Sequence, residues 1–216
     1  MKQLPMFKKV NNMLLTSKDC LLLLFYLTFI VTTGFSQTNN EVDSLNRKQG
    51  QWYYRISKDS INSTGELDYL DDPSILCFFT NDTLDKEFTL LNGERPILCF
   101  SYKMGKKNGV QKEYGTNSRL KELSFFQEGE LLYILFFDTN GRVAEEVQFK
   151  NNVKDGVSRI YNDEGKILQS KTFVKGKLEG DVIHYNKKGQ ITIIDIYKDD
   201  KLINMIIVPK RSRSKR

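Results

Sequence analysis

Hydrophobic and turn-forming positions recur about every 24 residues in the second half of the chain, a spacing typical of repeat proteins. Each period begins with an aromatic residue. A glycine, asparagine or aspartate follows three positions later, and in most periods a glycine follows seven positions later. These residue types tolerate a positive φ angle, so they mark turns between short apolar runs. The first aromatic residues of the periods are Tyr102, Phe126, Phe149, Phe173 and Tyr197.

The glycines of the repeat are predicted to be structural turn residues. Gly109, Gly156, Gly180 and Asn204 follow the first aromatic by seven positions, and Tyr133 is the one exception to this pattern. The repeat between Phe126 and Phe149 is also one residue short. The predicted turn glycines are Gly105, Gly109, Gly129, Gly156, Gly165, Gly176, Gly180 and Gly189.

One period predicts two strands. Residues 166–174 and 180–185 are rich in strand-forming residues, and the turn-rich segments 175–179 and 186–189 follow them. Turns this short cannot carry a parallel crossover, so the hairpins form an antiparallel meander. Outside the N-terminal leader, no window shows a helical apolar stripe. The predicted fold is all-β: an elongated antiparallel meander of repeated hairpins in one single-layer twisted sheet.

A second aromatic closes each apolar run before the next turn. It has two interpretations: cross-strand packing, and contact with a binding partner on a sheet with one open face. These residues are Tyr114, Phe137, Tyr161 and Tyr185.

Residues 1–36 have the pattern of a secretory signal peptide. Lysines precede an apolar run from residue 20 to residue 31, and Gly34-Phe35-Ser36 supplies small residues for cleavage before Gln37. A start at Met13 and an uncleaved anchor are the alternatives. The leader predicts export to the periplasm, the envelope or the medium. We divide the remainder into a divergent N-terminal cap (37–100), a repeat array (101–208) and a basic disordered tail (209–216).

The formal charge of +6 is concentrated at the two ends of the chain. Without the leader and the tail, residues 37–209 carry about two net negative charges, so no nucleic-acid partner is expected. The tail is predicted to be solvated, or to contact an anionic surface such as lipid headgroups. Its basic residues are Lys210, Arg211, Arg213, Lys215 and Arg216.

Cys77 and Cys99 occur in similar contexts, Ile-Leu-Cys-Phe in both cases. This similarity predicts equivalent strands of neighbouring repeats, which lie two strands apart, or about 9–10 Å. A disulfide needs Cα atoms within about 7 Å, so we expect two free thiols, with a bridge as the alternative if the irregular stretch between them draws them together.

The pattern Gly-x-x-x-Gly-x-x-x-x-Tyr followed by Asn-x-x-Gly, as in residues 176–189, resembles the variant MORN repeat of YwqK-type antitoxin proteins. The resemblance covers about residues 45–208 and is strongest over 147–204. It implies a twisted, elongated β-meander used for binding. The antitoxin function implies a cytoplasmic protein, whereas the leader predicts export.

No motif for catalysis, metal binding or a cofactor is present, and the single histidine, His184, is interpreted as a packing or surface residue. We therefore expect no enzyme, no catalytic residue, no metal site and no cofactor. The favoured function is a non-catalytic exported binding or scaffold module for a protein or glycan partner in a bacterial envelope. The alternative is an antitoxin-like or immunity protein that neutralises a toxic partner.

Overall fold

A computed structural model describes residues 40–56 and 70–209, which all lie within one structural unit, residues 39–216. The predicted signal peptide (1–36) and the basic residues of the tail (210–216) lie outside the described residues. The described part contains no helix, and its strands form one antiparallel sheet of 15 strands.

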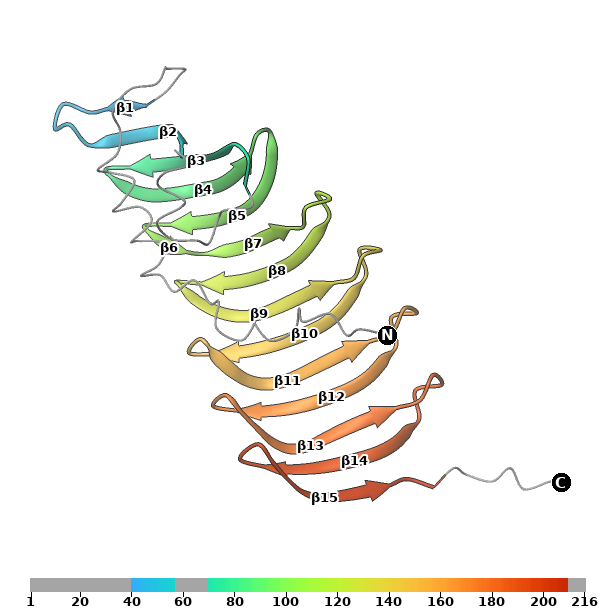
Figure 1. Ribbon diagram of the computed structural model, residues 1–216. Helices are drawn as coiled ribbons and strands as arrows, with labels where there is room; N and C mark the ends of the chain where they lie inside the picture. Colours follow the sequence, from blue (N-terminus) through green and yellow to red (C-terminus); the bar gives the residue numbers. More distant parts are fainter. Residues whose placement is uncertain (1–39, 57–69, 210–216) are drawn as a thin grey trace. The chain divides into compact units, whose positions relative to one another are not determined.

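The strands follow one another in meander order, as Figure 1 shows. Strand β6 is a two-residue strand that pairs with β5 beside β7. The predicted all-β antiparallel meander of hairpins is confirmed. The strands are β1 (Glu41–Val42), β2 (Lys48–Arg55), β3 (Pro73–Thr80), β4 (Thr83–Asn92), β5 (Arg95–Lys103), β6 (Lys106–Lys107), β7 (Gly109–Tyr114), β8 (Leu120–Gln127), β9 (Glu130–Phe137), β10 (Val143–Lys150), β11 (Val153–Tyr161), β12 (Ile167–Val174), β13 (Lys177–Tyr185), β14 (Ile191–Lys198) and β15 (Lys201–Ile207).

Two-residue turns join the strands along one edge of the sheet. Both residues of each turn have positive φ angles, for example 50° at Lys175 and 86° at Gly176, as a type I′ hairpin requires. Except at Asn151–Asn152, the second residue also donates its N–H to the preceding hairpin, as Gly176 does to the Lys154 carbonyl at 2.7 Å. The turns therefore link successive repeats. They are Asn81–Asp82, Met104–Gly105, Glu128–Gly129, Asn151–Asn152, Lys175–Gly176 and Asp199–Asp200.

Longer loops join the strands from β7 to β14 along the opposite edge, where β4 and β5 are joined by the two-residue turn Gly93–Glu94. In the loop between β9 and β10, Asp138 Oδ1 accepts the N–H groups of Asn140 and Arg142 at 2.8 and 2.9 Å. Asn162 and Asn186 accept equivalent bonds in later loops. A residue with positive φ completes each loop, so any side chain there other than glycine is strained. These residues are Ser118, Gly141, Gly165 and Gly189, and Asn46 has the same role in the β1–β2 loop, on the edge of the two-residue turns.

Three glycines predicted to lie in turns lie within strands, so that part of the prediction is wrong. Gly109 begins β7, and Gly156 and Gly180 lie inside β11 and β13, with φ angles of 101°, 108° and 81°. Each strand has extra residues opposite its hairpin partner near these positions, which form a bulge. The positive φ was predicted correctly. Its place was not, because a glycine permits a turn and a bulge equally.

Residues 40–56 and 70–100 belong to the same sheet as the repeats that follow. The sequence predicts a divergent cap over residues 37–100, yet Phe79 and the Asn81–Asp82 turn occupy repeat positions in the structure. Lys86 has a φ of 64° where later repeats have glycine. The repeat therefore begins before Tyr102, in a form that glycine spacing does not reveal.

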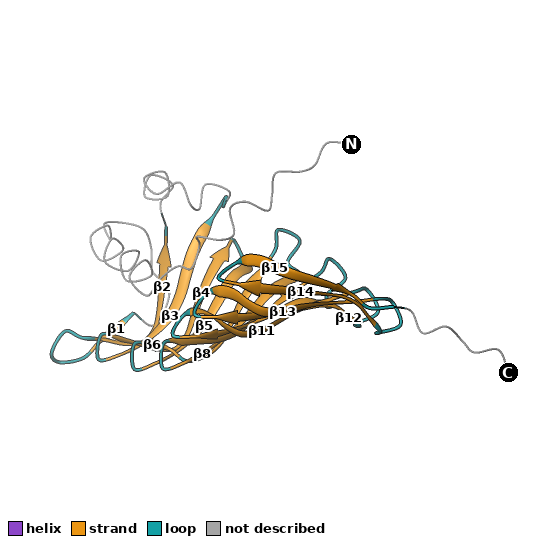
Figure 2. Cartoon of the chain, turned by 90° about the horizontal axis from the view of Figure 1, so that it is seen from below, coloured by secondary structure: helices purple, strands orange, loops and turns teal. Residues whose placement is uncertain are grey.

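Cross-strand partners share a face of the sheet, so the strand register assigns each side chain to one of two faces. We name the inner face by Cys77, Ser124, Ser158 and Val182, all of which are buried. Around Cys77, aromatic rings pack edge to face, with the Phe88 and Phe100 centroids 5.7 Å apart. The outer face is half-buried along most of its length. Figure 2 shows the strands as one curved layer.

Both described cysteines are free, as predicted. They lie on β3 and β5, two strands apart, and on opposite faces: Cys77 pairs with Phe88, whereas Cys99 pairs with its neighbour Thr89. Burial raises the pKa of the Cys77 thiol to about 12, so this thiol is unreactive at neutral pH.

Candidate functional site

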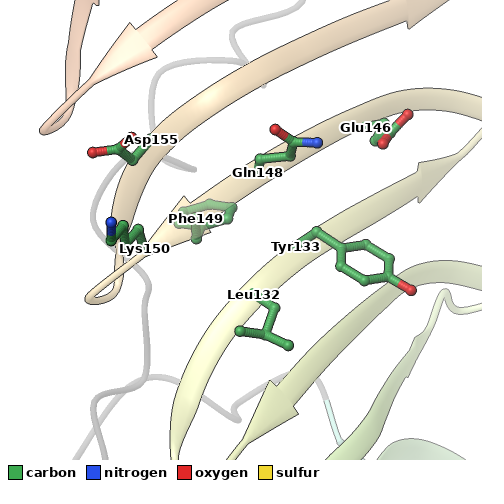
Figure 3. Close-up of a pocket in the computed structure, with 7 residues that line it drawn as sticks. All are labelled: Leu132, Tyr133, Glu146, Gln148, Phe149, Lys150 and Asp155. Carbon is green, nitrogen blue, oxygen red and sulfur yellow. The ribbon is translucent and has the colours of Figure 1, made fainter.

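A pocket of about 420 Å³ opens between β9, β10 and the start of β11 (Figure 3). It combines aromatic and aliphatic side chains with carboxylate, amide and ammonium groups, a mixture typical of binding sites. The residues that line it are Leu132, Tyr133, Glu146, Gln148, Phe149, Lys150 and Asp155.

Tyr133 is central to this pocket, and it is the residue at which the repeat departs from glycine. The β8–β9 hairpin has one extra residue, Leu132, between the pairs Phe125–Tyr133 and Phe126–Leu131. Tyr133 does not have a positive φ, unlike Gly109, the residue at its position in the preceding repeat. Its ring stacks on Phe125, with centroids 4.0 Å apart and planes inclined by 17°. Tyr133, at the position of a glycine without a side chain, therefore places an aromatic ring on the outer face at this bulge.

Gln148 forms the wall beside Tyr133, its direct partner on β10. Its Oε1 accepts the Val157 N–H at 2.9 Å. A Cβ atom at Gly156 would collide with that oxygen and would lie 3.1 Å from the Gln148 Cβ. Gly156 therefore has a second role besides its backbone angle: it leaves the room that fixes the Gln148 amide.

Glu146 lies two residues before Gln148 on the same face of β10. Its Oε2 accepts a hydrogen bond from the Tyr161 hydroxyl at 2.9 Å and pairs with Arg159 Nη1 at 3.4 Å. Burial, and then the bond to Glu146, raise the pKa of Tyr161, so this hydroxyl stays protonated and donates. These contacts hold the Glu146 carboxylate in a fixed orientation at the end of the pocket.

The charges around the pocket are nearly balanced. Glu146 is neutralised by Arg159, and Asp155 and Lys150 lie together at the end near the two-residue turn. Asp155 Oδ2 also accepts the Lys175 N–H at 3.1 Å from the next turn. An aromatic plate with fixed acceptors and little net charge suits a neutral polar ligand such as a peptide group or a sugar ring. The described residues contain no cluster of three metal-binding side chains.

The predicted aromatic residues occupy equivalent places, each at the end of a strand before a longer loop and each half-buried. Tyr161 is joined to the pocket through Glu146. The partner-binding role of the set remains a prediction. The set comprises Tyr114 at the end of β7, Phe137 of β9, Tyr161 of β11 and Tyr185 of β13.

His184 lies on the inner face in a polar cluster. Its Nε2 is 2.9 Å from Asp195 Oδ2, and the Gln169 amide lies 3.3 Å from its Nδ1. The second oxygen of Asp195, Oδ1, is buried and makes no hydrogen bond. This cluster does not line the pocket described above.

The sequence indicated Tyr133 only as an exception to the repeat, and Glu146 and Gln148 not at all as binding residues. The usable signal was the departure itself, because a bulky residue in place of a conformationally required glycine needs a compensating change nearby. Here that change is the smaller bulge at Leu132.

Comparisons with known proteins assign no family, since no family model and no curated protein matches the chain. Among solved structures, the chain is similar to a mutant of S. aureus TarM, crystallised with fondaparinux, alpha-GlcNAc-glycerol and UDP. The identity is 15%, the TM-score is 0.32, and the match covers 59% of this chain but 21% of that one. The chain thus spans about a fifth of that structure's length, and a likeness of this size says nothing about function.

Within residues 40–56 and 70–209, the chain has no helix that is long and apolar enough to cross a membrane.

Proposed function

We propose that this protein is a non-catalytic, exported binding and scaffold module whose protein or glycan partner docks on the outer face at the Tyr133 pocket. The observation that carries the proposal is the stacked pair Phe125 and Tyr133 beside the fixed acceptors Gln148 and Glu146. An open aromatic platform with oriented polar groups supports recognition rather than chemistry.

The repeat array supports a scaffold role. The described hairpins place their turns and loops along the same two edges of the sheet. Among these hairpins, only β8–β9 has a tyrosine at the bulge. One specialised repeat within a regular array gives the surface a single distinctive place for a partner. The resemblance to variant MORN repeats supports a binding role, and the predicted leader supports a place outside the cytoplasm.

Co-sedimentation with the isolated envelope fraction of the producing cells tests this proposal. We expect the wild-type full chain to sediment with envelopes and Tyr133→Ala to lose most of this binding. Tyr53→Ala is the matched control, because Tyr53 is an exposed tyrosine on the same face, in β2. Equal sedimentation of the two variants would refute a role for the pocket.

Pretreatment of the envelopes separates the two kinds of partner. Loss of binding after protease digestion indicates a protein, and loss after digestion with a glycan hydrolase indicates a glycan. Circular dichroism of each variant before sedimentation verifies that the sheet is intact.

A further inference from the structure

Strand β15 forms an open edge of the sheet and is exposed along its whole length. All seven of its residues are exposed, and most of them are apolar. Its only described neighbour is β14, which pairs with one side of the strand. Long apolar edges of this kind are templates for pairing with another chain. The exposed fractions are 49% for Leu202, 61% for Ile203, 52% for Met205, 44% for Ile206 and 72% for Ile207.

The backbone of β15 is positioned to accept a further strand. Just after the strand, the Val208 N–H donates to the Thr192 carbonyl at 2.9 Å, which fixes the direction of the ladder. Because successive residues of an antiparallel strand alternate direction, the backbone groups of Ile206 face β14. Those of Met205 and Ile207 face the open side, where the Met205 N–H donates to Asn204 Oδ1 at 2.9 Å, a local bond that a second strand would replace.

We propose that β15 pairs antiparallel with β15 of a second copy of this chain, which joins two sheets into one closed dimer. In an antiparallel pair of β15 strands, the residues whose backbone groups face the open side lie opposite each other. The pairing therefore continues the sheet from one copy into the other. Met205 and Ile207 of each copy then contact the same apolar row of the other copy. A single peptide strand would instead leave a new open edge.

The other end of the sheet favours this symmetric arrangement over a head-to-tail chain of copies. Strand β1 has only two residues and covers only Lys48 and Gln49 of β2, so this edge is interrupted and does not match the continuous seven-residue edge of β15. An interface that uses the same strand from both copies closes at two copies.

The charges at the beginning of β15 do not oppose this pairing. Asp199 pairs with Lys177, and Lys198 and Lys201 flank Asp199 and Asp200, so the local charge is balanced.

Light scattering after size-exclusion chromatography of the full chain tests the proposal. At about 50 μM, which is sufficient to reveal micromolar affinity, we expect a mass near twice 25.1 kDa. The double variant Met205→Lys with Ile207→Lys is expected to be a monomer. The matched control is Leu168→Lys with Val174→Lys, which adds the same charges at residues 37% and 45% exposed on β12, a strand paired on both sides.

A backbone test complements the side-chain test. Met205→Pro removes an N–H that faces the open side, a position at which edge strands tolerate proline. We expect this variant to keep the melting temperature of the parent chain and to be a monomer. A wild-type monomer would overturn the proposal and leave the edge to an extended segment of another protein. A persistent dimer in the β15 double variant, or loss of the dimer in the β12 control, would also overturn it.

Discussion

At the scale of single residues, two glycines at equivalent repeat positions differ in how much room a side chain would have. Gly156 and Gly180 occupy equivalent bulges and both have positive φ angles. A Cβ at Gly180 meets nothing within 4 Å, whereas at Gly156 it collides with the Gln148 side chain. Gly180→Ala should therefore cost about 1–2 kcal/mol for the backbone angle alone. Gly156→Ala should cost about 1–3 kcal/mol more, because the Val157 N–H loses its acceptor.

Urea unfolding monitored by circular dichroism measures both losses. Equal losses for the two alanine variants would contradict the second role assigned to Gly156. Lys177, the exposed first residue of β13, supplies the baseline when it is changed to Ala, and Gly180→Val should destabilise the chain much more than this change does.

Glu122 gives the fold a dependence on pH. Burial on the inner face raises the pKa of this carboxyl above its usual value of 4.5, and the hydroxyl of Ser124 partly offsets the shift. Because the folded pKa is the higher one, the contribution to stability is present below the unfolded pKa and is lost as pH rises through the folded pKa. Glu122→Gln should therefore unfold at a higher urea concentration than the parent at pH 8.

The same comparison at about pH 3.5 should show little difference, because Glu122 is then protonated in both states. Glu130→Gln, at an exposed position that begins β9, is the control and should change neither midpoint. If Glu122→Gln gave no advantage at pH 8, the buried carboxylate would not be a cost to the fold.

At the scale of the elements, the loops that follow β9, β11 and β13 are stabilised by the side chain of their first residue. Asp138 accepts two backbone N–H groups and the Arg142 side chain, and Arg142 in turn donates to the Asp163 carbonyl in the next loop. The backbone bond from Arg142 is the main cause of the lowered pKa of Asp138. We expect Asp138→Ala to lower the melting temperature more than Thr139→Ala, its exposed neighbour. Thermal unfolding measures the two melting temperatures. Equal melting temperatures for Asp138→Ala and Thr139→Ala would contradict the stabilising role of this loop.

The elements also show how far the sequence predicts this fold. Glycine and asparagine spacing predicted the hairpins, because positive φ is a local property of the residue. The same spacing failed around Phe79 and Lys86, where the structure keeps the repeat without the glycine. It also could not separate turns from bulges at Gly109, Gly156 and Gly180, since that distinction depends on the register with the neighbouring strand.

At the scale of the whole molecule, the candidate pocket could not be predicted from any one repeat. It needs Tyr133 from β9, Gln148 from β10 and Asp155 from β11 in adjacent positions. Their proximity follows from strand register, and a local pattern does not contain that information. The anomaly at Tyr133 was visible in the sequence, but its stacking on Phe125 was not.

The basic tail leads to a separate prediction for the whole chain. The charge of residues 210–216 contrasts with the nearly neutral body, and basic residues near an acidic membrane contribute about 1 kcal/mol each. Truncation after Pro209 should abolish co-sedimentation with anionic vesicles at low salt and leave the fold unchanged. If the truncated chain bound the vesicles equally well, the exposed apolar residues of the sheet would become the membrane-binding candidates.

Site-specific photocrosslinking in intact cells tests the central claim, partner binding at the Tyr133 pocket, most directly. A photoreactive benzoylphenylalanine replaces Tyr133 in one strain and the exposed Tyr53 of β2 in another. Because the pocket lies where Tyr133 stacks on Phe125, we predict a discrete adduct from position 133 and none from position 53. No adduct at position 133, or the same adducts from both positions, would contradict the account.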